Sequence, residues 1–271
     1  MCAVSALRGQ VAVVTGASRG IGKGIALGLG EAGATVYVTG RSAHLSPGPL
    51  PGTIEETAAE VTRLGGDGVA LRCDHRIDAD VQAVFDRVRE EQGGLDILVN
   101  NAFASPEQRV LWSGKPFWEL PMSLWDDLNS VGLRSHLVAS RCAVPLMLER
   151  GTGTILNVSS HAAGRAKAAG SERILPYSVV KAALHRLGAD MATELRDRGI
   201  AVISVWPPAT RTEGVLAQPD VFGDLTDWRS PLLTGRVLAA FLEAGDIMSR
   251  SGETIVIAEL ATQLGIIDPT R

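Results

Sequence analysis

A tyrosine and a lysine stand four residues apart in the segment Tyr177-Ser178-Val179-Val180-Lys181. Residues four apart on a helix lie on one face, so the phenol and the ammonium would be neighbours. A phenol has an ordinary pKa of about 10, and acid/base chemistry near neutral pH needs a pKa that is lower by roughly 2–3 units. A neighbouring positive charge lowers the phenol pKa because it favours the phenolate. The pair therefore suits proton transfer, although this spacing alone also arises by chance.

A glycine-rich loop lies near the amino terminus. The apolar run Val11–Val14 leads into Thr15–Gly22, whose sequence is Thr-Gly-Ala-Ser-Arg-Gly-Ile-Gly, and a helical pattern follows. Glycine is needed where such a turn approaches a pyrophosphate, and the start of the helix presents free N–H groups to it. A tight turn without a ligand is the alternative reading. A Walker loop is excluded, because Ala17 and Gly24 occupy positions, counted from Lys23, that require glycine and a hydroxyl residue.

Short apolar runs alternate with amphipathic segments along the chain, which is typical of repeated βαβ units. The predicted strands, nearly continuously apolar and therefore expected to be buried on both faces, are Val11–Val14, Val36–Thr39, Val69–Leu71, Ile97–Val99, Thr154–Val158, Ala201–Trp206 and Thr254–Ile257. The predicted helices are Gly20–Ala32, Ile54–Leu64, Ala79–Glu91, Leu124–Leu148 and Tyr177–Arg198. Ser123 is the predicted N-cap of the fourth helix.

The fold that these elements predict is α/β. We expect a single Rossmann-like, doubly wound domain over residues 1–271, with a mostly parallel seven-stranded sheet flanked by helices. The cofactor half is expected at about residues 8–105, and the catalytic and substrate half at about residues 106–258. Ser42–Gly52 is predicted to be a loop, and Pro207–Ser230 a lid over the site.

The sequence resembles the short-chain dehydrogenase/reductase family over roughly residues 8–258. Its motif Thr-Gly-x-x-x-Gly-x-Gly matches Thr15–Gly22, and its Ser…Tyr-x-x-x-Lys centre matches Ser160, Tyr177 and Lys181. The resemblance implies an oxidoreductase that transfers hydride between a nicotinamide and a carbonyl or secondary alcohol. Tyr177 would be the acid/base, Ser160 rather than Ser159 would bind the substrate oxygen, and Lys181 would hold the nicotinamide ribose.

NADP(H) is the expected cofactor, with NAD(H) as the alternative. The second predicted strand ends at Gly40 where NAD-binding folds carry an acid, and Arg41 follows with Arg19 facing the same corner. Arg41 as a solvated loop residue is the other reading. The resemblance assigns cofactor contacts to Gly16, Ser18, Arg19, Gly20, Ile21, Gly22, Arg41, Asp74, Asn101, Ala102, Tyr177, Lys181, Pro207 and Thr212.

The sequence departs from the family pattern at several places. Gly132 stands where the family has a catalytic asparagine, and Asn129 and His136 lie one helical turn to either side. Either side chain, or water in the room left by Gly132, is a possible replacement. Phe103 stands where the family's Asn-Asn-Ala-Gly turn has its glycine, and Pro208 replaces the glycine of Pro-Gly. These changes leave open a second reading, a cofactor-binding regulator with weakened catalysis.

Composition and net charge limit the partners and the location that we expect for the protein. The chain has a net charge of −4 with no basic stripe, so we expect no nucleic-acid partner. Three cysteines fit no disulfide or zinc spacing, which favours a reducing, cytoplasmic location without a metal. No apolar stretch reaches the length of a membrane span. The family resemblance implies self-association into a dimer or tetramer through the two long helices.

The predicted substrate is a small apolar carbonyl or alcohol. The aromatic and apolar residues expected near the pocket are Phe117, Trp118, Met122, Trp125, Phe222 and Trp228, although core packing explains some of them equally well. Reduction of enoyl thioesters is disfavoured, because related enoyl reductases space the tyrosine and the lysine more widely.

Overall fold

The computed structural model describes residues 6–44, 50–103, 108–164 and 175–269. In these residues seven strands form one sheet with the order β3-β2-β1-β4-β5-β6-β7, and every neighbouring pair is parallel. The strands are β1 Val11–Val14, β2 Thr35–Gly40, β3 Asp67–Arg72, β4 Ile97–Asn100, β5 Gly153–Val158, β6 Ile200–Trp206 and β7 Thr254–Val256. The predicted α/β fold with a parallel seven-stranded sheet is confirmed.

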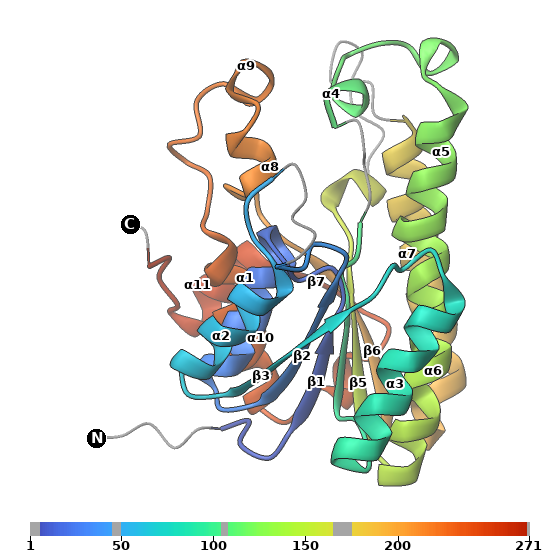
Figure 1. Ribbon diagram of the computed structural model, residues 1–271, viewed down its shortest axis with the longest axis vertical. Helices are drawn as coiled ribbons and strands as arrows, with labels where there is room; N and C mark the ends of the chain where they lie inside the picture. Colours follow the sequence, from blue (N-terminus) through green and yellow to red (C-terminus); the bar gives the residue numbers. More distant parts are fainter. Residues whose placement is uncertain (1–5, 45–49, 104–107, 165–174, 270–271) are drawn as a thin grey trace.

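Helices cover both faces of the sheet (Figure 1). One face carries α1 Gly20–Glu31, α2 Ile54–Arg63, α10 Pro231–Glu243 and α11 Ile257–Leu264; the other carries α3 Asp78–Gln92, α5 Met122–Asn129, α6 Ser135–Arg150 and α7 Leu175–Leu195. The shorter helices are α4 Gln108–Leu111, α8 Glu213–Leu216 and α9 Pro219–Phe222, with 3-10 turns at Phe117–Glu119, His161–Ala163, Arg196–Arg198 and Met248–Arg250.

The strands are buried on both faces because alternate side chains enter two different cores. In β1, Ala12 and Val14 pack with the α1 and α10 side, whereas Val11 and Val13 pack with the α3 and α6 side. Continuous apolar strands are what a sheet covered on both faces requires.

The strand order reverses between β1 and β4, and ligands of such sheets bind outside the carboxyl ends of the strands at this point. The glycine-rich loop follows β1, Asn101 and Ala102 follow β4, which ends at Asn100, and Ser159 and Ser160 follow β5. Parallel topology therefore brings these segments to one edge of the sheet.

The long helix predicted at Leu124–Leu148 differs from expectation. It begins at Met122 after Pro121, so Ser123 lies inside the helix and is not its N-cap; proline is tolerated at a helix start because the first N–H groups have no partner in the helix. A π-helical turn at Ser130–Arg134 separates α5 from α6 and contains Gly132. Such turns are rare and occur frequently at functional sites.

The segment predicted as a lid contains α8 and α9, which stand beyond the carboxyl ends of the strands (Figure 1). A parallel bridge between Thr210 and Arg229 ties its two ends together. Helix α10 is not among the elements predicted from the sequence, although its start carries a recognisable signal. Ser230 caps the helix by accepting a hydrogen bond from Leu233 N–H, and Pro231 occupies the first turn.

Candidate active site

The glycine-rich loop is held against the turn that follows β4. Gly16 has a φ of +64°, and a Cβ atom there would lie 2.7 Å from the Ala102 Cα atom. The Asn101 side-chain amide donates to the carbonyl oxygens of Thr15 at 2.8 Å and Gly16 at 3.0 Å. A Cβ atom at Gly22 would collide with this amide. Asn101 and Ala102 therefore fix the shape of the loop.

The start of α1 binds an anionic oxygen in this structure. The backbone N–H of Gly20 donates to Glu213 Oε2 at 2.7 Å. Thr212, the N-cap of α8, lies beside it, because a Cβ atom at Gly20 would be 3.4 Å from Thr212 Cγ2. Helix starts of this kind bind phosphate groups, so the loop fits the pyrophosphate of a dinucleotide.

Arg19 and Arg41 lie near each other at the carboxyl end of β2. Burial lowers the pKa of Arg19, the charge of Glu213 opposes this, and the charge of Arg41 lowers the pKa further. The Arg19 guanidinium donates to Ser42 Oγ and to the backbone carbonyls of residues 50–52 at 2.8–3.0 Å. Arg41 is exposed. Arg19 therefore anchors the loop that follows β2, and Arg41 presents its charge to solvent.

Asp74 lies at the end of β3, where the family resemblance places an adenine contact. Its carboxylate accepts two hydrogen bonds from the Arg76 guanidinium, at 3.2 and 2.9 Å, and the hydrogen bonds from Arg76 lower the pKa of Asp74. His75 beside it is buried, with Nε2 2.9 Å from Thr39 Oγ1. An adenine amino group at this place would share the Asp74 carboxylate with Arg76.

Ser160, Tyr177 and Lys181 come together at the carboxyl end of β5. The Ser160 hydroxyl lies close enough to the Tyr177 phenol to lower its pKa. Lys181 is only 4% exposed, and its Nζ atom donates to the Val158 carbonyl at 2.9 Å. Burial lowers the pKa of Lys181 to about 8, so its ammonium is held with little solvation.

The Tyr177 phenol differs from the expected electrostatic state. Burial raises the pKa of Tyr177, and the Ser160 hydrogen bond lowers it by a smaller amount. In the protein alone, desolvation of the phenolate therefore outweighs the groups that favour it.

The two candidate serines have different partners. Ser159 is buried, and its hydroxyl donates to the Lys181 backbone carbonyl at 3.1 Å, which ties β5 to α7. Ser160 caps the following 3-10 turn through Ala162 N–H at 3.2 Å and reaches Tyr177. The geometry thus brings Ser160, and not Ser159, to the phenol. His161 is exposed.

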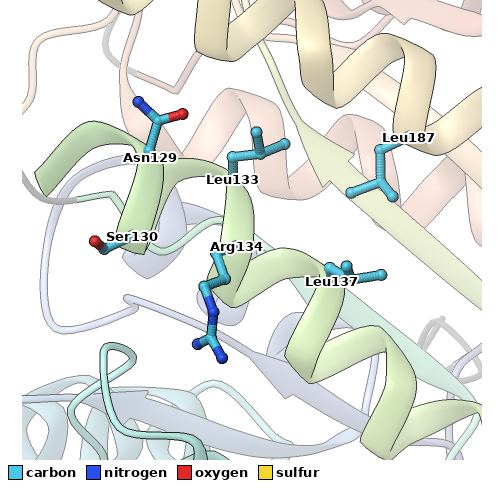
Figure 2. Close-up of a pocket in the computed structure, with 6 residues that line it drawn as sticks. All are labelled: Asn129, Ser130, Leu133, Arg134, Leu137 and Leu187. Atoms are coloured by element: carbon cyan, nitrogen blue, oxygen red, sulfur yellow. The ribbon is translucent and has the colours of Figure 1, made fainter. Parts of the chain in front are cut away.

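Asn129 and His136, the two candidates to replace the family's catalytic asparagine, lie in different surroundings. Asn129 lines a pocket of 430 Å³ on the outside of the helical layer, together with Ser130, Leu133, Arg134, Leu137 and Leu187 (Figure 2). Its side-chain amide donates to the Trp125 carbonyl at 2.8 Å. His136 is fully buried, and its Nε2 atom lies 3.0 Å from the Ala102 carbonyl. Only His136 faces the interior of the site.

An aromatic row leads from Tyr177 to the lid. The ring centroids of Trp112 and Tyr177 lie 5.9 Å apart, and Trp112 and Phe222 lie 5.6 Å apart. Phe222 in turn contacts Trp228, also at 5.6 Å. Trp112 was not among the predicted pocket residues, because no periodic pattern marks the segment that follows β4. The row brings an apolar surface to the phenol.

The other predicted pocket residues lie elsewhere. Phe117, Trp118 and Met122 are 57%, 71% and 69% exposed, and the ring of Phe117 contacts that of Trp118. Trp125 is half-buried on α5. Pro207 and Pro208 follow β6 and are half-buried. Of the six aromatic and apolar residues predicted to lie near the pocket, only Phe222 and Trp228 belong to the aromatic row that reaches Tyr177.

The described residues show neither a metal-binding cluster nor a membrane-spanning helix. Within the described residues, no group of three or more His, Cys, Asp and Glu side chains is placed to hold a metal ion. No helix in the same residues combines the length and the apolar character needed to cross a membrane.

Comparisons with known proteins agree with this geometry. A family model described as short chain dehydrogenase matches residues 10–219. The chain is 41% identical to Dehydrogenase/reductase SDR family member 1 of Mus musculus, over 98% of this chain and 85% of that protein.

Solved structures are also similar. A short chain dehydrogenase of Mycobacterium thermoresistibile has a TM-score of 0.80 and 30% identity, covering 96% of this chain and 88% of that one. A 7α-hydroxysteroid dehydrogenase, complexed with NADH and 7-oxo glycochenodeoxycholic acid, has a TM-score of 0.77 and 28% identity, covering 94% and 96%. The family model matches residues 10–219, and the relative and the solved structures cover nearly the whole chain, which belongs to the short-chain dehydrogenase/reductase family of oxidoreductases that use nicotinamide cofactors.

Proposed function

We propose that this protein is an NADP(H)-dependent oxidoreductase that interconverts a carbonyl and a secondary alcohol on a small apolar substrate. One arrangement carries the proposal: the Ser160 hydroxyl lies close enough to the Tyr177 phenol to lower its pKa, and the buried Lys181 ammonium lies 5.7 Å from the centroid of the phenol ring. These three groups are what protonation of a carbonyl oxygen requires, namely a donor, a hydrogen-bonding partner and a positive charge.

In the proposed reduction, Tyr177 is the general acid. Its hydroxyl proton passes to the substrate oxygen, and the electron pair of the O–H bond stays on the phenolate. The Lys181 ammonium stabilises that phenolate, and the Ser160 hydroxyl hydrogen-bonds the substrate oxygen. The nicotinamide, when bound, supplies or accepts the hydride. In oxidation, the Tyr177 phenolate takes the proton of the alcohol.

The chain's own residues also provide the proposed cofactor contacts. The loop at Gly16–Gly22 would hold the pyrophosphate through backbone N–H groups, since the N–H of Gly20, at the start of α1, already donates to a carboxylate oxygen. Lys181 would hold the nicotinamide ribose, and Thr212 and Pro207 would border the nicotinamide. Asp74, Asn101 and Ala102 would surround the adenosine.

The preference for NADP(H) rests on the end of β2. Gly40 offers no carboxylate for a ribose hydroxyl, and the exposed Arg41 offers a guanidinium suited to a 2′-phosphate. Arg19 lies near Arg41 and adds positive charge at the same corner, although its own donors bind the neighbouring loop.

The apolar substrate rests on the row formed by Trp112, Phe222 and Trp228. An aromatic wall favours steroid-like, lipid-like or aromatic ketones, because such surfaces leave water together on binding. A 7α-hydroxysteroid dehydrogenase among the similar structures acts on such a ring system, with NADH.

Turnover of a panel of ketones and aldehydes with NADPH and with NADH tests this function. We expect reduction of apolar ketones, with a kcat/KM for NADPH at least about tenfold above that for NADH. An NADH preference would overturn the cofactor assignment. Tight NADPH binding without turnover of any carbonyl would favour the alternative, a cofactor-binding regulator.

We also propose a cytoplasmic protein that self-associates through the face of α6 and α7. Leu137 is 50% exposed there and lines the outer pocket with Leu133 and Leu187 (Figure 2). Sedimentation equilibrium of the wild type and of Leu137→Lys tests the interface. We expect a dimer or tetramer that the charged variant weakens; a monomeric wild type would contradict the proposal.

A further inference from the structure

Phe103 lies directly behind the proposed catalytic pair. It follows Ala102 in the turn after β4, and its ring meets the Tyr177 ring nearly at right angles, with centroids 5.6 Å apart. The Lys181 Nζ atom lies over the Phe103 ring, 5.4 Å from its centroid, and 5.7 Å from the centroid of Tyr177. One phenylalanine therefore contacts both reacting side chains.

Gly132 gives the Phe103 ring its space. A Cβ atom at Gly132 would be in van der Waals contact with Phe103 Cδ2 at 3.6 Å and in tighter contact with Val180 Cγ1 at 3.2 Å, so a side chain longer than that of alanine would compete with the ring for space. Gly132 lies in the π-helical turn between α5 and α6, and Phe103 comes from the turn after β4. Two of the positions at which the chain departs from its family, Phe103 and Gly132, thus meet in space.

We propose that Phe103 is a positioning residue, which holds the Lys181 ammonium against its ring and packs on Tyr177 in the space that Gly132 leaves open. The inference rests on the proposed function for its catalytic consequence, but the contact itself is a property of the protein alone. Phe103, in the space beside Gly132, would thus fix the positions of Lys181 and Tyr177 relative to each other.

Two physical effects of the ring act on the ammonium. The negative face of an aromatic ring attracts a cation, and this attraction is strongest where water is excluded. The bulk of the ring also helps to exclude that water, and exclusion disfavours the charged form of the lysine. A substitution that keeps the bulk and removes the ring isolates the first effect.

Within the described residues, few titratable groups face Lys181. His136 on α6 is fully buried with a pKa lowered to about 3, first by burial and then by the Lys181 charge. Tyr177 and His185 lie on α7 itself; burial raises the pKa of Tyr177 and lowers that of His185. Ser160 adds a neutral hydroxyl from the end of β5. His136 stays neutral above pH 5, so it does not confuse a titration of the lysine.

The test is a direct titration of Lys181 in the cofactor-free protein. The chain has only four lysines, Lys23, Lys115, Lys167 and Lys181, so ¹³C-labelled lysine gives four side-chain signals, and Lys181→Arg identifies the one of interest. The variants are Phe103→Leu, which keeps apolar bulk without a ring, and Phe103→Tyr, which keeps the ring face.

We expect Phe103→Leu to lower the pKa of Lys181 by about 0.5–1 unit, because the ammonium loses its ring. Phe103→Tyr should leave that pKa within about 0.2 unit of wild type. In alcohol oxidation with NADP⁺, the basic limb of the kcat profile should move down in pH for Phe103→Leu alone. An unchanged Lys181 pKa in Phe103→Leu would overturn the proposal.

A second arm tests the shared space. Gly132→Asn should lower both the melting temperature and kcat, because its side chain collides with the ring. Phe103→Ala in the same chain should relieve the collision. Each single variant has a kcat relative to wild type, and independent positions would give the double variant the product of these two ratios. We expect the relative kcat of the double variant to be at least about threefold higher than that product. Simple multiplication of the two effects would show that the positions do not share one volume.

The proposed function and the role of Phe103 can be contradicted separately. If no carbonyl is turned over by the wild type, the proposed function fails, while the lysine titration still decides the role of Phe103 in holding the ammonium. If turnover is normal and the titration is insensitive to the ring, the function stands and Phe103 is only a filler of space.

Discussion

The carboxylate of Glu213 accepts a hydrogen bond from the backbone N–H of Gly20 at 2.7 Å, across 193 positions of sequence. Gly20 is the first residue of α1, where the helix dipole and free N–H groups favour an anion. Glu213 is the first residue of α8 in the lid. A carboxylate from the lid thus occupies the place that the proposed pyrophosphate requires.

Glu213→Gln should therefore bind NADPH more tightly, since the cofactor would displace a weaker, uncharged partner from Gly20. We expect the Kd to fall at least about fivefold, equivalent to ~1 kcal/mol, as measured by calorimetry or by cofactor fluorescence. Asp220→Asn removes one charge from the same lid without this contact and should leave the Kd unchanged. Weaker binding by Glu213→Gln would show that the carboxylate assists the cofactor.

Tyr177→Phe should remove catalysis and little else. Loss of a general acid lowers rates by about 10²–10⁴-fold, so kcat should fall at least about a hundredfold, while the melting temperature and the Kd for NADPH stay near wild type. The chain has one other tyrosine, Tyr37, whose hydroxyl donates to Glu91 at 2.7 Å. Tyr37→Phe should lower the melting temperature and spare kcat. Undiminished turnover by Tyr177→Phe would exclude the mechanism.

Arg41→Gln should weaken the use of NADPH selectively. Losing a guanidinium contact to a 2′-phosphate should lower kcat/KM for NADPH at least about tenfold and leave the value for NADH nearly unchanged. Arg63→Gln, at the exposed end of α2, is the matched loss of charge. An equal decrease with both cofactors would place Arg41 outside the phosphate site.

Trp112→Ala should discriminate among substrates. Because the Trp112 ring lies beside Tyr177 and Phe222, its loss should lower kcat/KM for bulky apolar ketones by about fivefold or more and affect small polar carbonyls less. Trp118→Ala removes a tryptophan that is 71% exposed and should have no effect on either class. Equal losses for both classes would mean that Trp112 supports the fold and not the pocket.

Acid should destabilise the protein through its buried histidines. Burial lowers the pKa of His136 to about 3 and that of His75 to about 4, below the ordinary value of 6.5. Below pH 6.5 the histidines of the unfolded chain bind protons, whereas the buried histidines of the folded protein stay neutral. Their contribution to the free energy of unfolding is therefore full above pH 6.5 and falls as the pH decreases toward the folded-state pKa values. Each histidine contributes at most about 1.4 kcal/mol per pH unit.

His136→Gln keeps a donor for the Ala102 carbonyl and does not titrate, so its loss of stability between pH 7 and pH 5 should be smaller than that of wild type. Urea unfolding at the two pH values measures the difference. If both proteins lose the same stability over this interval, His136 is not a buried neutral group.

Local patterns predicted the strands, the glycine-rich loop and the Tyr177–Lys181 pair. Helix and strand periodicities, and the sharp turns that need glycine, depend on neighbouring residues, so they can be recognised along the chain. Parallel topology follows from the alternation of these elements and brings Ser160 and the glycine loop to one edge of the sheet.

Tertiary structure alone decided the contacts between Phe103 and Gly132, between Trp112 and Tyr177, and between Gly20 and Glu213. Each of these pairs joins segments that are distant in sequence, and their atoms meet only because the fold packs those segments against each other. It also decided the charge states, since burial raises the pKa of Tyr177 although its local sequence favours a lower one. Desolvation depends on everything that surrounds a group, and no spacing along the chain contains that information.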